Sequence, residues 1–523
     1  MQRSTLEMSR RQPRERPDAV AWTTPDRDWT FGEVQTLTNR LANALAALGV
    51  GRGDRVACLT KHQPECAMLI LAAQKLGAVC MPVNWRLAPP EVQYIVDDGQ
   101  ARLLMVDPAF EPVAASLDAP TLRATIATRP GGTLPDLQAW TAAHPDVDPG
   151  FEPGPEDIAL QLYSSGTTGL PKGVELSHRA LTHSHVDGVS REWGYDPRVH
   201  VNLNVLPAFH IAGAGVALMT HAFGGRSVTM PDFDPQGALD AIERERVTHA
   251  FLVPAMIQFM LAVPDVASRD LSSLRMISYG ASPISDRVLT DAMRVFGCDF
   301  LQVYGLTETC GAVTALRAHD HATEGPKAAL LRSAGEPMVD VEVRVVRPGT
   351  REDCDDDEVG ELWIRSPKNM SGYWRKPQAS AEAFEPDPRG DPPWFRSGDA
   401  GYRRGKYLFL HDRLKDMIVS GGENIYPAEV ENALMQHPAV ADGAVIGVPD
   451  GTWGEAVKAV VVLRPGASAT ERDIVEFVRA RIAHYKSPKS VDFVDAIPRN
   501  PSGKILKRVL REPYWAGRDR RIA

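Results

Sequence analysis

Segments of helical and strand-like pattern alternate along the first 300 residues, and this alternation restricts the folds open to the chain. Residues 33–48 carry apolar side chains at helical spacing and are followed by Gly49, which predicts a helix that ends there. Further strands and helices are expected at 55–62, 237–246, 247–254, 274–280 and 285–296. Parallel sheets covered by helices produce this pattern, so we expect an α/β fold.

The pattern changes in the second part of the chain. Short alternating strands separated by Gly, Pro and Asp turns predict a small β subdomain at about 335–411. The segment after it contains strands and helices of its own and has the length of a small domain. Because 523 residues exceed one compact core, we expect an N-terminal domain at 1–411, a boundary at 412–416 and a small α+β domain at 417–523.

Composition excludes several classes of protein. Hydrophobic residues make up 43% and charged residues 24% of the chain, values close to the average for globular proteins, which argues against disordered, collagen-like and coiled-coil chains. The net charge of −9 argues against nucleic acid as the main partner, because binding to the phosphate backbone needs a basic surface. We therefore expect no nucleic-acid partner, although a local basic pocket stays open.

The same inspection favours a cytoplasmic protein without an integral membrane segment. The six cysteines form no CxxC pair, so neither a zinc site nor a disulfide framework is indicated. The N-terminal residues are rich in Arg and lack the apolar region of a secretory signal. The most apolar stretch, 67–83, contains Gln74 and Lys75 and is too short to span a bilayer.

The Gly-rich stretch YSSGTTGLPKG at 163–173 has the composition of a phosphate-binding loop. Glycines allow a close approach of the backbone to an anion, hydroxyls donate hydrogen bonds, and Lys172 supplies positive charge. The common nucleotide loop requires Gly before its Lys and Ser or Thr after it, but Lys172 lies between Pro171 and Gly173. Taken alone, the stretch is equally well explained as a solvent-facing turn.

A second stretch, YGLTET at 304–309, follows an apolar run and is expected where a strand ends and a loop begins. Ligands of open α/β sheets bind at this position. The ring of Tyr304 could stack on a base, Thr307 could donate to a phosphate, and Glu308 could hold Mg²⁺. An ordinary capped turn also explains this hexapeptide.

Three further stretches carry candidate polar groups. Asp399 is expected on a Gly-flanked loop, where its carboxylate could accept from both hydroxyls of a ribose. Arg413 precedes a Gly-Gly turn at 421–422, and Lys504 follows a Pro-Ser-Gly turn. A turn-capping aspartate and a solvated lysine are the ordinary interpretations of such residues.

Together and in this order, these stretches resemble the adenylate-forming (ANL) superfamily of acyl-CoA synthetases, carrier-loading adenylation domains and beetle luciferases. The resemblance covers about residues 20–510. It implies the ANL fold, use of ATP, Mg²⁺ and coenzyme A, and activation of a carboxylic acid as an acyl-AMP before its transfer to a thiol. It also implies that the loop at 163–173 binds the β- and γ-phosphates of ATP.

The resemblance assigns roles to individual residues. Thr307 would contact the α-phosphate, Glu308 would bind Mg²⁺, and Lys504 would bridge the substrate carboxylate and the α-phosphate. Lys415 would be the hinge about which the C-terminal domain rotates between the two steps. The implied contacts to ATP or AMP are Ser164, Ser165, Gly166, Thr167, Thr168, Gly169, Lys172, Tyr304, Gly305, Thr307, Asp399 and Arg413. The implied pantetheine contacts are Ser420, Gly421, Gly422 and Glu423.

The stretch LPAFHIAGAG at 206–215 matches the part of the family that lines the acyl pocket. It contains no carboxylate to pair with an α-amine, which argues against an amino-acid substrate and for a fatty, aryl or polycyclic acid. His210 could gate the pocket or contact the carboxylate, although a satisfied buried histidine explains it nearly as well. The expected pocket residues are Phe209, His210, Tyr279, Gly280, Ala281, Gly305, Thr309 and Gly311, and ordinary packing is the competing explanation for the small ones.

Several alternatives stay open at this point. The family includes ligases that load a carrier protein, but no carrier domain follows Ala523 and there is little room after YGLTET for a long insertion, which favours CoA. A chain with all the motifs could still catalyse only one half-reaction efficiently. A luciferase-like oxygenase is the alternative of another class, and a homodimer is expected only by analogy with the family.

Overall fold

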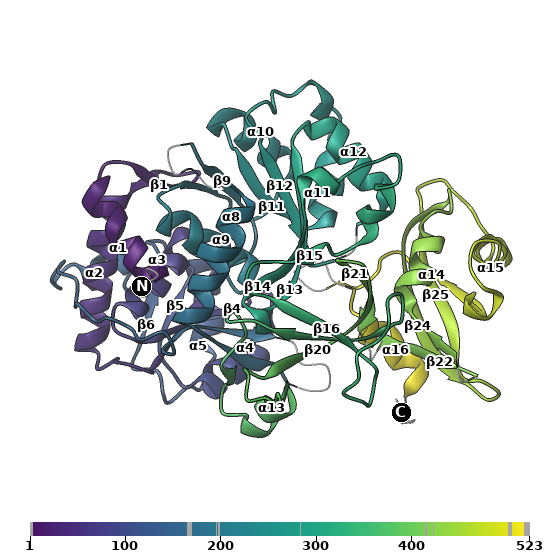
Figure 1. Ribbon diagram of the computed structural model, residues 1–523. Coiled ribbons are helices and arrows are strands. Elements are labelled where there is room, and N and C mark those ends of the chain that lie inside the picture. Colours follow the sequence, from purple (N-terminus) through teal and green to yellow (C-terminus); the bar gives the residue numbers. More distant parts are fainter. Residues whose placement is uncertain are drawn as a thin grey trace.

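The computed structural model shows two helix-covered sheets, a small antiparallel sheet and a separate C-terminal sheet (Figure 1). The described residues are 4–164, 170–194, 196, 199–282, 284–413, 416–421, 423–499 and 505–516. The expected fold class is therefore confirmed.

The first sheet has seven strands in the order β18-β8-β7-β4-β3-β5-β6. The strands from β7 to β6 are parallel, and the β7–β8 and β8–β18 pairs are antiparallel. Their bounds are β3 Arg55–Leu59, β4 Val79–Val83, β5 Ala101–Val106, β6 Ala124–Ala127, β7 Ile158–Ser164, β8 Lys172–Ser177 and β18 Gly372–Tyr373.

The second sheet has nine strands in the order β15-β14-β13-β12-β11-β9-β10-β1-β2. Its centre, from β1 to β13, is parallel, whereas β2, β14 and β15 are added in antiparallel fashion. Their bounds are β1 Val20–Thr23, β2 Asp28–Thr30, β9 Val201–Asn204, β10 Arg226–Thr229, β11 His249–Leu252, β12 Met276–Gly280, β13 Asp299–Leu306, β14 Gly311–Leu316 and β15 Glu336–Pro337.

Helices cover both sheets, and their ends agree with the sequence pattern to within a few residues. The helix expected at 33–48 begins earlier, at Phe31, because Thr30 and Glu33 form a reciprocal capping box. The helices of this part are α1 Thr5–Glu15, α2 Phe31–Ala47, α3 Pro64–Gln74, α4 Pro89–Gly99, α5 Glu111–Ala115, α6 Leu137–Thr141, α7 His178–Thr182, α8 Ser190–Glu192, α9 Ile211–Ala222, α10 Pro235–Glu245, α11 Pro254–Leu261 and α12 Asp286–Phe296. A π-helix, η2, spans His183–Val189, and single 3₁₀ turns are η1 Pro108–Phe110, η3 Val266–Ser268, η4 Thr307–Thr309, η5 Ala318–Asp320 and η6 Ala328–Arg332.

The apolar stretch 67–83 forms most of α3 and all of β4. Helix α3 is buried on nearly all sides because it packs between the strands of the first sheet and the helices α2 and α9. Within the described residues, no helix combines the length and apolarity needed to cross a membrane.

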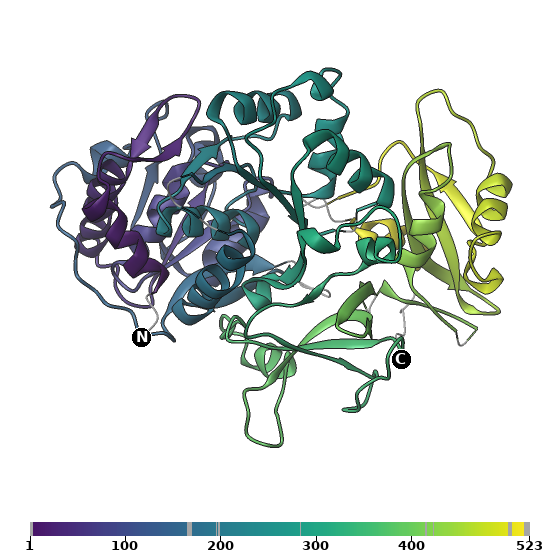
Figure 2. The ribbon, with the colours of Figure 1, turned by 45° about the horizontal axis from the view of Figure 1, so that its top comes forward.

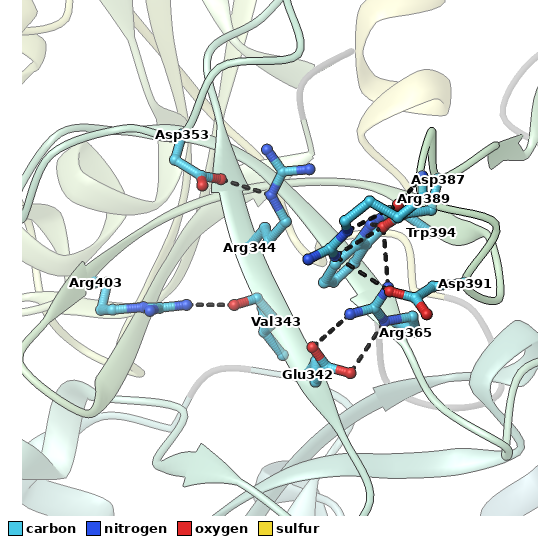
Figure 3. Close-up of polar contacts among 10 residues, drawn as sticks. All are labelled: Glu342, Val343, Arg344, Asp353, Arg365, Asp387, Arg389, Asp391, Trp394 and Arg403. Carbon is cyan, nitrogen blue, oxygen red and sulfur yellow. Dashed lines mark hydrogen bonds and ion pairs between the residues drawn. The ribbon is translucent and has the colours of Figure 1, made fainter.

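The small β sheet lies beside the two helix-covered sheets, where Figure 2 shows it in green at the bottom. It consists of β16 Glu342–Val346, β17 Gly360–Arg365, β19 Phe384–Glu385, β20 Trp394–Arg404 and β21 Tyr407–Arg413, with helix α13 at Pro377–Glu382. Arg365 pairs with Glu342 at 2.6 Å and with Asp387 at 3.0 Å across its surface (Figure 3). The side chain of Glu342 is 61% exposed, so its pair with Arg365 fixes geometry more than it adds stability, whereas Asp387 is largely buried.

The C-terminal sheet has the order β23-β22-β25-β24, with β26 parallel to β25. It lies at one end of the molecule, at the right of Figure 1, and α14 contacts β21 of the small sheet. Its elements are β22 Ile418–Ser420, β23 Glu423–Ile425, α14 Pro427–Leu434, β24 Val440–Asp450, β25 Gly454–Leu463, α15 Glu471–Arg479, η8 His484–Lys486, β26 Ser490–Phe493 and α16 Lys507–Trp515. The division into domains at 411 and 417 stays a prediction.

Candidate active site

Two residues expected to bind the nucleotide touch each other although 95 positions separate them. The hydroxyl of Tyr304 on β13 donates to Oδ2 of Asp399 on β20 at 2.6 Å. Asp399 is also the register partner of Arg413 on β21. The contact brings the end of the nine-stranded sheet against the small β sheet, and Asp399 is only 9% exposed there.

The expectation that Asp399 lies on a loop is wrong, because it lies inside strand β20. Between the pairs formed with β17, the three residues Ser397, Gly398 and Asp399 face the single residue Leu362. Gly398 adopts a φ of +68°, which an L side chain rarely adopts. The Ser-Gly-Asp sequence therefore forms a β-bulge that re-aims a side chain without ending the strand.

Tyr304 also lies within a strand rather than at its end. The parallel pairing of β13 with β12 stops at Val303, as expected for a ligand edge, but antiparallel pairing with β14 extends β13 to Leu306. The turn follows only at η4, which contains Thr307 and Glu308. The sequence therefore correctly predicted where the parallel pairing of β13 ends, but not that β13 continues to Leu306 by pairing with β14.

The carboxylate of Glu308 receives two hydrogen bonds on the same oxygen. Ser164 Oγ donates to Glu308 Oε1 at 3.0 Å, and the Tyr373 hydroxyl donates to it at 3.2 Å. Ser164 is the last residue of β7, directly before the Gly-rich loop. The candidate Mg²⁺ ligand and the beginning of the candidate phosphate loop are therefore in contact.

The other end of the loop is also placed. Lys172 begins β8 and is the register partner of Ser164, so the loop joins two paired strands. The ammonium group of Lys172 lies over the Tyr373 ring, 4.9 Å from its centroid. Tyr373 was not singled out in the sequence, and its place within SGYW gave no local signal of contacts to residues 65 and 201 positions away.

His210 lies directly before α9, with its ring 4.6 Å from that of Phe209. Its Nε2 is buried and has no hydrogen-bond partner among the residues that the structure describes. Burial lowers the pKa of His210 to about 4, so the imidazole is neutral near pH 7. Buried nitrogens of His62, His185 and His221 share this feature, so it does not by itself distinguish a ligand contact from ordinary packing.

Close backbone packing accounts for several of the small residues expected in the acyl pocket. A Cβ at Gly280 would lie 2.3 Å from the carbonyl oxygen of Val303, and one at Gly305 would lie 1.9 Å from that of Gly311. Gly311 differs, because the nearest atoms to its Cβ position are on Ile211 at 3.7 Å and Ser184 at 3.9 Å. Gly311 therefore offers space where Gly280 and Gly305 do not.

The remaining expected pocket residues have structural partners. Tyr279 is fully buried and its hydroxyl forms a hydrogen bond with His321 Nε2 at 3.0 Å, while Thr309 Oγ1 donates to the carbonyl oxygen of Gly311 at 2.8 Å. Ala281 adopts a φ of +67° at the end of β12. Such a conformation costs roughly 1–2 kcal/mol for a residue with a Cβ, and it marks a point of backbone strain next to the parallel edge.

Two family models match the chain. The model for the AMP-binding enzyme covers residues 9–374, and the model for the AMP-binding enzyme C-terminal domain covers residues 429–504. This chain belongs to the AMP-binding enzyme family. The acyl-pocket stretch at 206–215 and all the expected contacts to ATP or AMP except Asp399 and Arg413 fall inside the first match, and Lys504 is the last residue of the second.

Similar proteins include ligases of two kinds. The fatty acid–acyl-carrier-protein ligase ScoC of Streptomyces coeruleorubidus is 38% identical over 505 residues, which is 95% of this chain and 93% of that protein. A feruloyl-CoA synthase of Amycolatopsis is 40% identical over 489 residues, or 93% of this chain and 94% of that protein. Among solved structures, ATP-bound MatB from Rhodopseudomonas palustris aligns with a TM-score of 0.88 and 30% identity, covering 98% of this chain and 99% of that one.

Some of the site residues expected for this AMP-binding enzyme lie outside the described residues. They are Ser165, Gly166, Thr167, Thr168, Gly169, Lys415, Gly422 and Lys504. For Arg413 only the backbone placement in β21 is described. The roles of these residues stay predictions.

The stretch expected to contact pantetheine lies where strands β22 and β23 of this AMP-binding enzyme pair. Ser420 of β22 pairs with Glu423 of β23, as the expected Gly-Gly turn requires. Gly421 adopts a φ of +61°, and a Cβ there would lie 2.6 Å from Trp453 Cε3. The turn therefore requires glycine both for its backbone conformation and for the space that Trp453 occupies.

Proposed function

We propose that this AMP-binding enzyme is an acyl-CoA ligase for a hydrophobic carboxylic acid. An oxygen of the substrate carboxylate attacks the α-phosphorus of ATP, and the bond from that phosphorus to the bridging oxygen breaks, which releases pyrophosphate. The sulfur of CoA then attacks the acyl carbon of acyl-AMP, AMP leaves, and the thiol proton passes to solvent. The junction of Tyr304, Asp399 and the β21 strand is the observation that best supports a nucleotide at this position.

The chemistry of the side chains indicates which part of the nucleotide each of them would bind. The Asp399 carboxylate is suited to accept hydrogen bonds from ribose hydroxyls, because each oxygen of an ionised carboxylate can accept more than one hydrogen bond. Lys172 and the hydroxyls of the loop would hold the β- and γ-phosphates, and Lys504 would stabilise the charge that develops at the α-phosphate.

Glu308 fits a magnesium ion. Both of its described side-chain donors approach Oε1, so Oε2 receives neither of these two hydrogen bonds. Within the described ranges, no group of three His, Cys, Asp or Glu side chains could hold a metal ion. Mg²⁺ at Glu308 would therefore take most of its ligands from phosphate oxygens and water, and it would neutralise the charge of the triphosphate.

The acid is proposed to be fatty, aryl or polycyclic. The stretch 206–215 carries no carboxylate that could pair with an α-amine, and His210 within it is neutral near pH 7. A Cβ at Gly311 would meet Ile211 only at ordinary van der Waals distance, so we propose that an apolar group of the acid lies near this side of the glycine. Relatives named for fatty and ferulic acids support this class of substrate.

A carrier protein is the second candidate acceptor, and the similarity to ScoC is the observation that favours it. CoA and a holo carrier protein both present the thiol of a pantetheine, so the chemistry of the second step is the same. In either case we propose rotation of residues 417–523 about the hinge at 412–416 and action in the cytoplasm, with a homodimer as the assembly expected by analogy.

The test combines two assays over one panel of fatty, aryl and amino acids. Acid-dependent exchange of radioactive pyrophosphate into ATP reports the first step, and thioester formation from CoA or from a holo carrier protein reports the second. We expect exchange with hydrophobic acids and a thioester with CoA. Preference for an amino acid, or transfer to the carrier protein alone, would overturn the corresponding part of the proposal.

A further inference from the structure

Tyr373 contacts two candidate nucleotide-binding residues that approach it from different elements. Its hydroxyl donates to Glu308 Oε1 at 3.2 Å, and its ring faces the ammonium group of Lys172, with 4.9 Å between Nζ and the ring centroid. Glu308 comes from η4 and Lys172 from the beginning of β8. One side chain thus connects the candidate Mg²⁺ ligand with the end of the candidate phosphate loop.

The position of Tyr373 is determined by its own backbone rather than by these two contacts. Strand β18 pairs with β8, with Tyr373 opposite Val174 and Gly372 opposite Glu175. The amide of Tyr373 donates to Ser380 Oγ at 2.8 Å. The ring is therefore presented from a fixed edge strand, which lets it orient more mobile groups.

The next residue strengthens this anchor. The amide of Trp374 donates to the carbonyl oxygen of Gly173 at 2.8 Å, and its indole nitrogen donates to the carbonyl oxygen of Asp98 at 2.9 Å. The guanidinium of Arg55 lies 3.3 Å from the centroid of the Trp374 ring. The residue after Tyr373 is therefore fixed by contacts to Gly173, Asp98 and Arg55, which also restrict the position of Tyr373.

The hydroxyl contact has a consequence for Glu308. Tyr373 and Ser164 donate to the same oxygen, so together they fix the rotation of the carboxylate and leave Oε2 outside both hydrogen bonds. A carboxylate held in one orientation loses less freedom when it binds a cation. The hydroxyl of Tyr373 therefore favours the orientation in which Oε2 is offered to the metal.

The ring contact acts on Lys172. An ammonium group over an aromatic face is attracted by the ring quadrupole, and the attraction restricts a long, flexible side chain. Ser164 and Lys172 are register partners on either side of the loop. Ser164 contacts Glu308 directly, whereas Lys172 contacts the ring of Tyr373, whose hydroxyl contacts Glu308.

We propose that Tyr373 is a positioning residue that couples Lys172, at the beginning of β8, to the magnesium site at Glu308. The inference rests on the proposed function, since it takes Mg²⁺ and ATP to bind at Glu308 and Lys172. Its hydroxyl sets the affinity for ATP in the presence of Mg²⁺, and its ring supports the binding of the triphosphate whether or not the metal is present.

The experiment measures ATP binding to the full chain by calorimetry, without any acid, once with excess EDTA and once with Mg²⁺. For Tyr373→Phe, which keeps the ring, we expect binding with EDTA within about twofold of the unmodified chain and a loss of about fivefold in the enhancement by Mg²⁺. For Tyr373→Leu, which removes the ring as well, binding with EDTA should also weaken, by about threefold or more.

The matched control is Tyr407→Phe. Its hydroxyl donates to a buried carboxylate, Asp320 Oδ2, at 3.1 Å, but it lies outside the site. This variant should leave the enhancement by Mg²⁺ unchanged. The inference would be overturned if Tyr407→Phe lost as much of the Mg²⁺ enhancement as Tyr373→Phe, or if Tyr373→Phe lost none of it. It would also be overturned if Tyr373→Phe bound ATP equally more weakly with and without Mg²⁺.

Failure of this inference can be told apart from failure of the proposed function. The unmodified chain is assayed in parallel for acid-dependent exchange of pyrophosphate, which does not involve the variants. If exchange is absent but the difference between Tyr373→Phe and Tyr407→Phe is found, only the proposed reaction fails. If Tyr373→Leu does not fold, as judged by its circular dichroism, Tyr373→Phe and its control still decide the role of the hydroxyl.

Discussion

Replacement of Asp399 by Asn should remove most of the ribose contribution to ATP binding. The variant keeps the shape of the side chain and one carbonyl oxygen, which Tyr304 would continue to occupy with its hydrogen bond of 2.6 Å. The amide nitrogen cannot accept a hydrogen bond from a ribose hydroxyl. A hydrogen bond to a charged group contributes about 1.5–3 kcal/mol, so the Kd for ATP should rise by about 10- to 150-fold.

Deoxynucleotides make this prediction sharper. Titration calorimetry of the unmodified chain with ATP, 2′-deoxy-ATP and 3′-deoxy-ATP should show that at least one missing hydroxyl costs about tenfold in affinity. Asp399→Asn should bind that analogue and ATP with equal affinity, because the variant no longer has the carboxylate oxygen that accepts from the missing hydroxyl. Asp320→Asn is the control, since Asp320 also accepts a tyrosine hydroxyl but lies outside the site.

Two results would refute the reasoning. If the Kd of Asp399→Asn for ATP stays within twofold of the unmodified value, Asp399 does not hold the ribose. If the missing hydroxyl costs the same affinity in both chains, the hydroxyl binds elsewhere. A loss of affinity in Asp320→Asn of the same size would indicate a general effect on folding instead.

Three further predictions concern stability, acyl specificity and the second step. Burial lowers the pKa values of four histidines to about 4, so unfolding takes up protons between about pH 6.5 and about pH 4. The Tm should therefore fall as the pH drops through this range, and a constant Tm in calorimetry would contradict this. These histidines are His62, His178, His185 and His210. Ile211→Trp should shift the preference of pyrophosphate exchange towards smaller acids, because Ile211 lies 3.7 Å from the Cβ position of Gly311, and an unchanged acid profile would count against that pocket. Gly421→Ala should slow thioester formation while pyrophosphate exchange stays within twofold, since its φ of +61° and Trp453 leave no room for a Cβ, and equal losses in both steps would exclude this local role.

Much of the fold could be predicted because its pattern is local. Helix α12 begins and ends within one residue of the expected 285–296, since Ser285 caps its first turn and Gly297 adopts the left-handed conformation after its last. The sequence of the apolar stretch 67–83 did not show which elements would surround it. Only the tertiary structure shows that α3 packs between a sheet and two helices.

The candidate site shows where local pattern fails. The motif around Asp399 indicated a ribose contact, but the bulge that holds it depends on pairing with β17, a strand that is not adjacent to β20 in the sequence. Tyr373 lacked any local signal, because its two contacts depend on β18 joining the edge of β8. The strain at Ala281 was equally invisible, since nothing in its neighbours requires a positive φ.

The central claim is that this chain joins a hydrophobic acid to AMP and then passes the acyl group to a thiol. The most direct measurement incubates the purified chain with ATP, Mg²⁺, CoA and a panel of acids, and determines AMP, pyrophosphate and thioester by mass spectrometry. The account predicts all three products in equal amounts, with hydrophobic acids preferred and no product without acid. Absence of AMP and thioester with every acid, and also with acyl-AMP supplied directly, would contradict it.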